Sequence, residues 1–252
     1  MKIACLCPTY KRPLQLANVA ECFLRQDYPE SQRRLFILDD ASQHVFNFEF
    51  PSIRVKHAEN RIPNLPLKFN LIAEWAGFEW QPDVMVVWED DDVFLPWHLS
   101  SIAKAVEEGG EYLVSEEVWS TYNEPEGSIH LEGAAGRFHS SWAFTSELFH
   151  RVGGYPETSR LDFDQQMRNR LSQGAKSGLS FYSGPSGSLP PSYVYRWGNG
   201  VYHGSQAGEE GFADLWSHLE TLPDPFQGPI QPRFDNETEI IYGSEICVGH
   251  TA

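Results

Sequence analysis

The sequence contains few cysteines, has no long hydrophobic run and carries far fewer basic than acidic residues. Its four cysteines form no pair of CxxC motifs, and Cys5 and Cys7 would share one face of a strand, where they are poorly placed to bond each other. This pattern favours reduced thiols over a disulfide scaffold or a zinc ribbon. No segment approaches the roughly 20 apolar residues of a membrane span, and residues 1–8 are too short for a signal peptide. We therefore expect a cytoplasmic protein with no integral membrane contact.

The charge balance is strongly acidic. The 252 residues include 35 Asp and Glu against 19 Lys and Arg, which gives a formal net charge of −16. Repulsion from phosphate disfavours bulk nucleic acid and anionic membranes as partners, although a local basic pocket for one nucleotide is compatible with it. With 41% hydrophobic residues, the chain can bury the core of one large or two small α/β domains. Aromatic residues reach 13%, and such rings often stack on sugars or bases.

A buried strand followed by four acids is the most informative stretch. Val84–Val87 is a continuous apolar run, typical of a strand that is buried on both faces, and the acids Glu89–Asp92 follow it closely. Carboxylates this close raise each other's pKa, so a cation would stabilise them. Hard oxygen ligands suit Mg²⁺ or Mn²⁺. Ligands of open α/β sheets bind beyond the carboxyl ends of the strands, where these acids are expected to lie. A solvated turn is the alternative.

Strands and helices alternate through the first half of the chain. Apolar runs predict the strands, and prolines mark helix starts. The alternation predicts a mostly parallel, Rossmann-like sheet. The sequence has no GxGxxG, so it lacks the fingerprint of a dinucleotide-binding site. The expected strands are Lys2–Cys7, Leu35–Leu38, Ile53–His57 and Val84–Trp88, and the expected helices begin at Pro13, at Asn64 or Pro66, and at Trp97.

The second half is richer in glycine, serine and proline. We expect short strands at Glu111–Ser115, Ser141–Thr145 and Ser192–Arg196, and helices after Ser146, over Leu161–Leu171 and over Glu209–Leu219. We expect loops at Asn123–Gly136, Gly174–Pro191 and Trp197–Gly204, and from Thr221 an irregular tail with one β-like run near Ile240.

Four motifs in this order resemble the family 2 glycosyltransferases of the GT-A fold. CPTYKRP is similar to the family's PTYNR, ILDDAS to VDDGS, WEDDDVFLP to its DXD-type metal motif, and GGYPE with LDFDQQMRNRL to GGFDE…EDxDLxxR. The resemblance implies an α/β fold with a single mostly parallel central sheet flanked by helices and a smaller acceptor-side subregion. Residues 1–99 would form the nucleotide-sugar-binding half, 100–220 the acceptor and catalytic-base half, and 221–252 the tail.

The resemblance implies a nucleotide site at the ends of the first strands. Asp39 would accept the N3–H of uracil, and the neighbouring Asp40 would either share this role or cap the following turn. Arg61 and Lys68 would lie near the diphosphate, or else be ordinary surface charges. The nucleotide-binding residues implied in this way are Pro8, Thr9, Tyr10, Arg12, Asp39, Arg61, Lys68 and Asp90.

The resemblance also implies a Mn²⁺ or Mg²⁺ ion that bridges the two phosphates. The key acid would be Asp91, five residues before Pro96, with Asp92 as a further ligand. Two registers fit the DXD spacing, Glu89-x-Asp91 and Asp90-x-Asp92. His203 is a candidate metal ligand, with a structural histidine as the alternative.

The catalytic base implied by the resemblance is Asp162, six residues before Arg168. The family's Glu before this base is replaced by Leu161, so Asp164 competes for the role. Trp142 and Arg196 are candidates for contacts to the donor or acceptor sugar or to the diphosphate, with core packing as the alternative for Trp142.

The expected function is an inverting, metal-dependent transfer of a sugar from a nucleotide diphosphate donor, UDP above all, to a hydroxyl of a glycan, a small molecule or a protein. The first alternative is a protein that binds nucleotide sugar or carbohydrate without turnover, which Leu161 favours. The second is a sugar nucleotidyltransferase, which the lack of glycine in PTYKRP disfavours. The segment 174–187 is a candidate lid over the donor.

Overall fold

The computed structural model describes residues 1–40, 46, 50–122, 124–125, 128–197 and 229–248. The chain order of the elements is β1 (Ile3–Thr9), α1 (Pro13–Leu24), η1 (Glu30–Gln32), β2 (Arg33–Asp40), β3 (Ile53–Ala58), α2 (Leu65–Glu79), β4 (Val84–Val87), β5 (Val93–Phe94), α3 (His98–Glu107), β6 (Tyr112–Ser115), β7 (Glu117–Ser120), β8 (His130–Gly133), η2 (His139–Ser141), β9 (Ala143–Thr145), α4 (Ser146–Arg151), α5 (Phe163–Gly174), β10 (Leu179–Ser183), β11 (Tyr193–Tyr195), α7 (Asn236–Tyr242) and α8 (Glu245–Val248).

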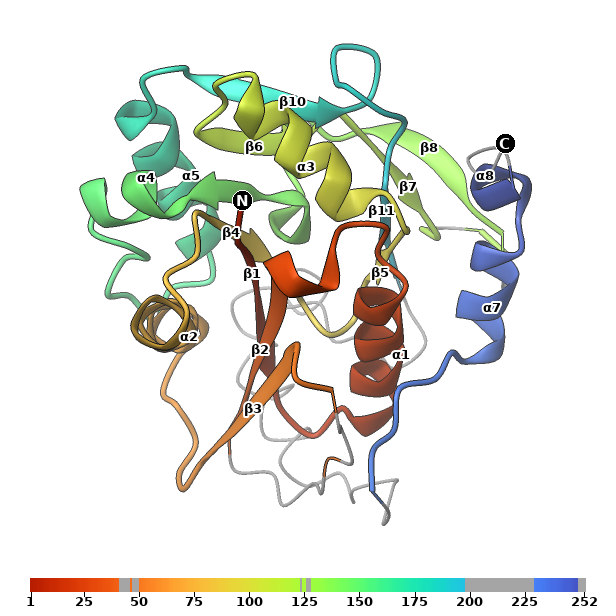
Figure 1. Ribbon diagram of the computed structural model, residues 1–252, viewed down its shortest axis with the longest axis horizontal. Helices are drawn as coiled ribbons and strands as arrows, with labels where there is room; N and C mark the ends of the chain where they lie inside the picture. The colour runs from red at the N-terminus through yellow and green to blue at the C-terminus, as the bar shows by residue number, and fades with distance from the viewer. Residues whose placement is uncertain (41–45, 47–49, 123, 126–127, 198–228, 249–252) are drawn as a thin grey trace.

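A seven-stranded sheet forms the centre of the fold, with the order β10-β6-β9-β4-β1-β2-β3 (Figure 1). β1 pairs in parallel with β2 and β4, β2 with β3, and β6 with β10. Only β9, inserted between β4 and β6, runs antiparallel to its neighbours in this sheet. The mostly parallel sheet that the sequence predicts is confirmed. The carboxyl ends of β1, β2 and β4 therefore meet at one edge of the sheet.

Helices cover both faces of the sheet, as expected for apolar strands without alternation. Side chains alternate along β1, so that Cys5 and Cys7 pack in the core with α1 and α3, while Leu6 packs in the core with α2, α4 and α5. All four cysteines, which lie in the described part of the chain, are buried free thiols. Within the same part, no helix has the length and hydropathy needed to cross a bilayer.

Local sequence signals set the helix starts. Pro13 opens α1, and Pro66 lies in the first turn of α2, where a missing N–H costs nothing. The Asn64 side chain accepts a hydrogen bond from the Leu67 N–H at 2.9 Å and so caps α2. Both helix starts agree with the sequence-based prediction.

A second sheet of four strands has the order β5-β11-β7-β8. The loop of residues 88–92, here called the acid loop, connects β4 of the large sheet to β5 of the small one. The Trp88 ring stacks on the Phe94 ring with centroids 3.8 Å apart, and both rings are fully buried. The acid loop is therefore fixed at both ends by buried structure.

Three sequence-based expectations were wrong. β8 and β10 lie within segments that we expected to be loops, because pairing with β7 and β6 overrides the Gly- and Ser-rich surroundings. The region near Ile240 is helical rather than β-like, because the Asp235 side chain caps α7 by accepting from the Thr238 N–H at 2.8 Å. The helix expected over 209–219 lies outside the described residues.

Two leucines on α1 provide a test of how the helix packs. Leu16 is fully buried in the core, whereas Leu14 is 44% exposed. We expect Leu16→Ala to lower the free energy of unfolding by about 2–5 kcal/mol, because it leaves a cavity against the sheet. Leu14→Ala should cost less than about 1 kcal/mol. Urea denaturation followed by circular dichroism measures both, and equal losses would show that α1 does not bury this face.

Candidate active site

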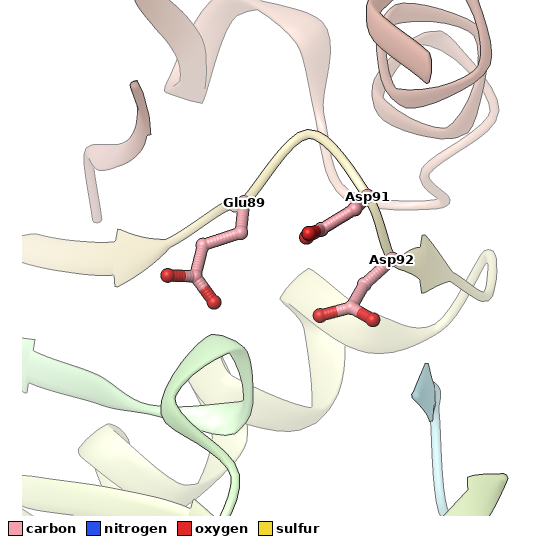
Figure 2. A group of neighbouring side chains, drawn as sticks. All are labelled: Glu89, Asp91 and Asp92. Atoms are coloured by element: carbon pink, nitrogen blue, oxygen red, sulfur yellow. The ribbon is translucent and has the colours of Figure 1, made fainter. Parts of the chain in front are cut away.

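Three carboxylates of the acid loop converge. Oxygen atoms of Glu89, Asp91 and Asp92 lie within 4.8 Å of one another. Figure 2 shows their side chains together on the inner side of the loop that links β4 to β5. Three hard oxygen donors in this arrangement suit Mg²⁺ or Mn²⁺. Of the two registers that the sequence left open, the geometry brings together the acids of Glu89-x-Asp91, with Asp92 added.

Asp90 turns instead toward the end of β1. Its carboxylate accepts hydrogen bonds from the Thr9 hydroxyl at 2.6 Å and from the Arg12 guanidinium at 2.7 Å. The same Arg12 nitrogen lies 2.8 Å from a carboxylate oxygen of Asp91. The motifs PTYKR and EDDD, about eighty residues apart in the sequence, therefore form one network. The structure thus brings together Thr9, Arg12 and Asp90, three of the residues that the resemblance implies for nucleotide binding.

The electrostatics of the acid loop show a surplus of negative charge. Burial raises the pKa of Asp90, repulsion from Asp91 adds to it, and Arg12 opposes it. Burial and the Asp91 charge raise the pKa of Asp92 well above its ordinary value, although Tyr193 donates to it. Burial would lower the pKa of Arg12, yet the attraction of Asp90 and Asp91 outweighs it and raises that pKa. A bound cation would relieve this repulsion, so the donor set fits a divalent metal.

Asp92 is held from the small sheet. The Tyr193 hydroxyl donates to it at 2.6 Å, and the backbone N–H of Arg196 donates to it at 3.0 Å. The buried Arg196 side chain donates through Nε to the Asp91 carbonyl at 2.9 Å and lies 3.2 Å from the Asp235 carboxylate. Arg196 thus links the acid loop to the C-terminal segment. The sequence did not mark Tyr193 or Asp235, because neither lies in a motif.

Glu89 is held by the segment before β9. His139 Nδ1 lies 3.0 Å from one carboxylate oxygen, and the Ser140 hydroxyl donates to the other at 2.5 Å. His139 Nε2 lies 2.8 Å from the hydroxyl of Tyr155, which belongs to the GGYPE motif. Sequence reasoning found that motif, but it missed His139 and Ser140.

A second buried network lies beneath the end of β1. Lys68 of α2 donates to the Thr9 carbonyl at 2.5 Å and forms a buried ion pair with Asp40. The other Asp40 oxygen accepts from the Ile62 N–H at 2.9 Å. Burial lowers the pKa of Lys68, and Asp40 opposes that shift. Lys68 therefore holds the backbone at the end of β1 in place.

The neighbouring strand ends carry the other expected nucleotide residues. Thr9 and Asp39 are partners in the β1–β2 register, and the buried Asp39 carboxylate lies 3.2 Å from His57 Nδ1. The Arg61 guanidinium lies 4.0 Å from the centre of the Tyr10 ring. The buried Pro8 belongs to β1 itself.

The acids of the LDFD segment lie at the start of α5. Asp162 is the residue that precedes the first turn, and its side chain is 45% exposed. It accepts from Arg160 at 2.9 Å and from Gln166 at 3.0 Å, and these hydrogen bonds, that of Arg160 first, lower its pKa. Asp162 is therefore an ionised acceptor at neutral pH. Asp164 accepts from the Gln165 N–H at 2.7 Å.

Trp142 and His203 are the remaining residues that the sequence analysis named for the site. Trp142 is fully buried, and its ring packs edge-on against His139 and Tyr112 at 4.8 and 5.8 Å. Its indole N–H donates to the Gly136 carbonyl at 3.2 Å. Trp142 therefore packs beneath His139 in the core. His203 lies outside the described residues.

Comparison with known proteins identifies the fold. No family profile and no curated protein sequence matches the chain. The structure of S. aureus TarS 1–349 matches with a TM-score of 0.62 at 14% identity, covering 78% of this chain and 60% of that chain. Its complex with UDP-GlcNAc matches at 0.59 and 14%, covering 89% and 68%. The mannosyltransferase PcManGT from Pyrobaculum calidifontis, in complex with GDP-Man and Mn²⁺, matches at 0.56 and 14%, covering 96% and 69%.

These matches, at low identity, show the fold alone. The chain has the GT-A fold that the sequence predicts, with its mostly parallel sheet and covering helices. It spans about 60% of the length of the TarS 1–349 chain.

The Lys68–Asp40 pair carries a stability prediction. We expect Lys68→Met to lower the free energy of unfolding by about 3–5 kcal/mol, because it leaves the Asp40 carboxylate buried without its cation. Lys176, whose side chain is 72% exposed, provides the control, and Lys176→Met should change stability by less than about 0.5 kcal/mol. Guanidinium denaturation measures both variants. Similar stability in the two would show that Lys68 is not the partner of Asp40.

Proposed function

We propose that the protein is a metal-dependent, inverting glycosyltransferase that uses a nucleotide diphosphate sugar, with UDP as the nucleotide. The observation that carries this proposal is the convergence of Glu89, Asp91 and Asp92 at the carboxyl end of β4 in a GT-A fold. The solved neighbours include complexes with UDP-GlcNAc and with GDP-Man and Mn²⁺. The acceptor would be a hydroxyl of a glycan, a small molecule or a protein.

The three converging acids would hold the metal, as Mn²⁺ or Mg²⁺. A divalent ion at this place neutralises negative charge on the departing nucleoside diphosphate. Arg12 pairs with Asp91 of this cluster and with the neighbouring Asp90, and it adds a second positive charge near the end of β1. Because Thr9 and Arg12 both donate to the Asp90 carboxylate, the three residues would keep the nucleotide side of the site in one arrangement.

The nucleobase would bind at the ends of β1 and β2. A carboxylate such as Asp39 suits the N3–H donor of uracil, and Asp39 lies beside Thr9 in the sheet register. In the structure, His57 Nδ1 contacts one oxygen of the Asp39 carboxylate, Oδ2. Uracil would bind the carboxylate beside this contact or in place of it. The Tyr10 ring, with Arg61 on its face, offers a flat surface at the same end of the sheet.

Asp162 is proposed as the catalytic base. The acceptor hydroxyl would give its proton to the Asp162 carboxylate while its oxygen bonds to the anomeric carbon. The bond from that carbon to the diphosphate oxygen breaks in the same displacement, which inverts the configuration. The exposure of Asp162 lets an acceptor reach it from solution, and its lowered pKa keeps the carboxylate ionised while the bond to Arg160 reduces its basicity. Release from Arg160 would free the carboxylate for this role.

Binding without turnover is the second candidate function. The family's Glu before the base is Leu161 here, which is 40% exposed, and Asp162 is paired with Arg160. Such a chain would keep the nucleotide site, while Asp162 would stay bonded to Arg160 and accept no proton.

Nucleotide binding tests the donor site. We expect UDP with Mn²⁺ to raise the unfolding midpoint by about 5–10 °C at 100 times its Kd, since the ligand binds only the folded chain. GDP, CDP and dTDP should give smaller shifts, and Asp91→Asn should remove the metal-dependent part. Differential scanning fluorimetry with and without Mn²⁺ measures these shifts. If no nucleotide moves the midpoint, the transferase proposal fails.

Substitution of the base separates catalysis from binding. Asp162→Asn should lower transfer about 10²–10⁴-fold, because it removes the proton acceptor, while UDP binding stays unchanged. Asp164→Asn is the matched control and should retain transfer. Donor consumption in the presence of candidate acceptor hydroxyls provides the readout. Full activity in Asp162→Asn with loss in Asp164→Asn would move the base to Asp164.

A further inference from the structure

His139 occupies a buried position between two parts of the candidate site. It begins η2 and its side chain is 8% exposed. Four aromatic rings surround it nearly perpendicular to its plane, with centroid distances of 4.8–5.7 Å; they belong to Phe69, Trp142, Tyr155 and Phe163. This packing leaves the imidazole little freedom to rotate.

The hydrogen bonds of the ring define its tautomer. The Glu89 carboxylate can only accept when ionised, so His139 Nδ1 carries the proton and donates at 3.0 Å. In the neutral ring Nε2 is then an acceptor, to which the Tyr155 hydroxyl, 2.8 Å away, can donate. A chain of donors therefore runs from Tyr155 through His139 to Glu89.

Glu89 depends on these neighbours for its direction. Glutamate has one more rotatable bond than aspartate, and Glu89 is 24% exposed in its side chain, whereas Asp92 is buried and held by Tyr193. His139 and Ser140 each bond one of the two carboxylate oxygens of Glu89. These two contacts keep the carboxylate near Asp91 and Asp92, where a metal ion would need it.

The same ring contacts the helix that carries the proposed base. Phe163 is the first residue of α5 and directly follows Asp162, and its ring centroid lies 5.6 Å from that of His139. Tyr155 is in turn fixed by α2, because its N–H donates to the Asn70 side chain at 2.9 Å. His139 therefore touches both the acid cluster and the start of α5.

We propose that His139 is a positioning residue: it orients Glu89 within the metal-binding cluster and joins that cluster to the start of α5. This role rests on the proposed function, since it requires Glu89 to serve as a metal ligand. It assigns no bond-making step to His139 itself. Residues that hydrogen-bond metal ligands in this way contribute about 10–100-fold to metal affinity or activity.

Mn²⁺ binding without nucleotide tests the role, measured by the electron paramagnetic resonance signal of free and bound Mn²⁺. His139→Phe keeps a ring in the pocket and removes both nitrogens, and it should weaken Mn²⁺ binding about 10–100-fold. His139→Asn places an amide N–H where Nδ1 was and should recover much of the affinity. Ser140→Ala, which removes one Glu89 bond without a cavity, should weaken binding several-fold. His150→Phe, on the exposed part of α4, is the control and should bind as the wild type does.

The outcomes are distinct. Wild-type affinity in both His139→Phe and Ser140→Ala overturns the role, and so does wild-type affinity in His139→Phe with a loss in His139→Asn, because that result would reflect ring packing alone. If His139→Phe does not fold, Ser140→Ala decides, with unchanged affinity contradicting the role. A wild-type chain that binds UDP but no Mn²⁺ overturns the metal site and this role together. A wild-type chain that binds Mn²⁺ normally, with unaffected variants, leaves the proposed function intact.

Discussion

The arrangement of the site depends on holding several carboxylates together at the end of one buried strand. β4 is covered on both faces, and Trp88 is stacked in the core, so the acids that follow cannot move apart by shifting the backbone. Burial, and after it the charge of Asp91, raises the pKa values of Asp90 and Asp92. Such a concentration of charge is stable only when donors and cations surround it.

Side chains from different parts of the chain hold these acids in place. Asp90 is held from β1 by Thr9 and Arg12, and Asp92 is held from β11 by Tyr193. Glu89 is held from η2 by His139. These contacts join segments that are 50 to 101 residues apart in the sequence. A four-residue motif therefore organises the junction between the two sheets, and the folding of each segment contributes to the geometry of the acids.

Local sequence predicted the parts of the site that lie in motifs. The apolar run Val84–Val87, the acids after it, and the placement of Thr9 and Arg12 at the end of β1 all follow from strand patterning and the topology of parallel sheets. His139, Tyr193 and Asp235 could not be found in this way, because their roles depend on contacts across the tertiary structure. Lys68 shows a related limit: the family resemblance implied a residue near the diphosphate, and the structure pairs its buried side chain with Asp40.

The two halves of the candidate site differ in how firmly they are built. The acid loop is buried and bonded on three sides, whereas Asp162 is nearly half exposed and bonded to neighbours on its own segment. A donor site gains from such rigidity, because a nucleotide diphosphate has fixed dimensions and charge. An acceptor site built on an exposed helix start can change its specificity through the loops around it without disturbing the acids. Leu161, which precedes Asp162, lies on this exposed side. Changes around Asp162 can therefore leave the buried network of the acid loop undisturbed.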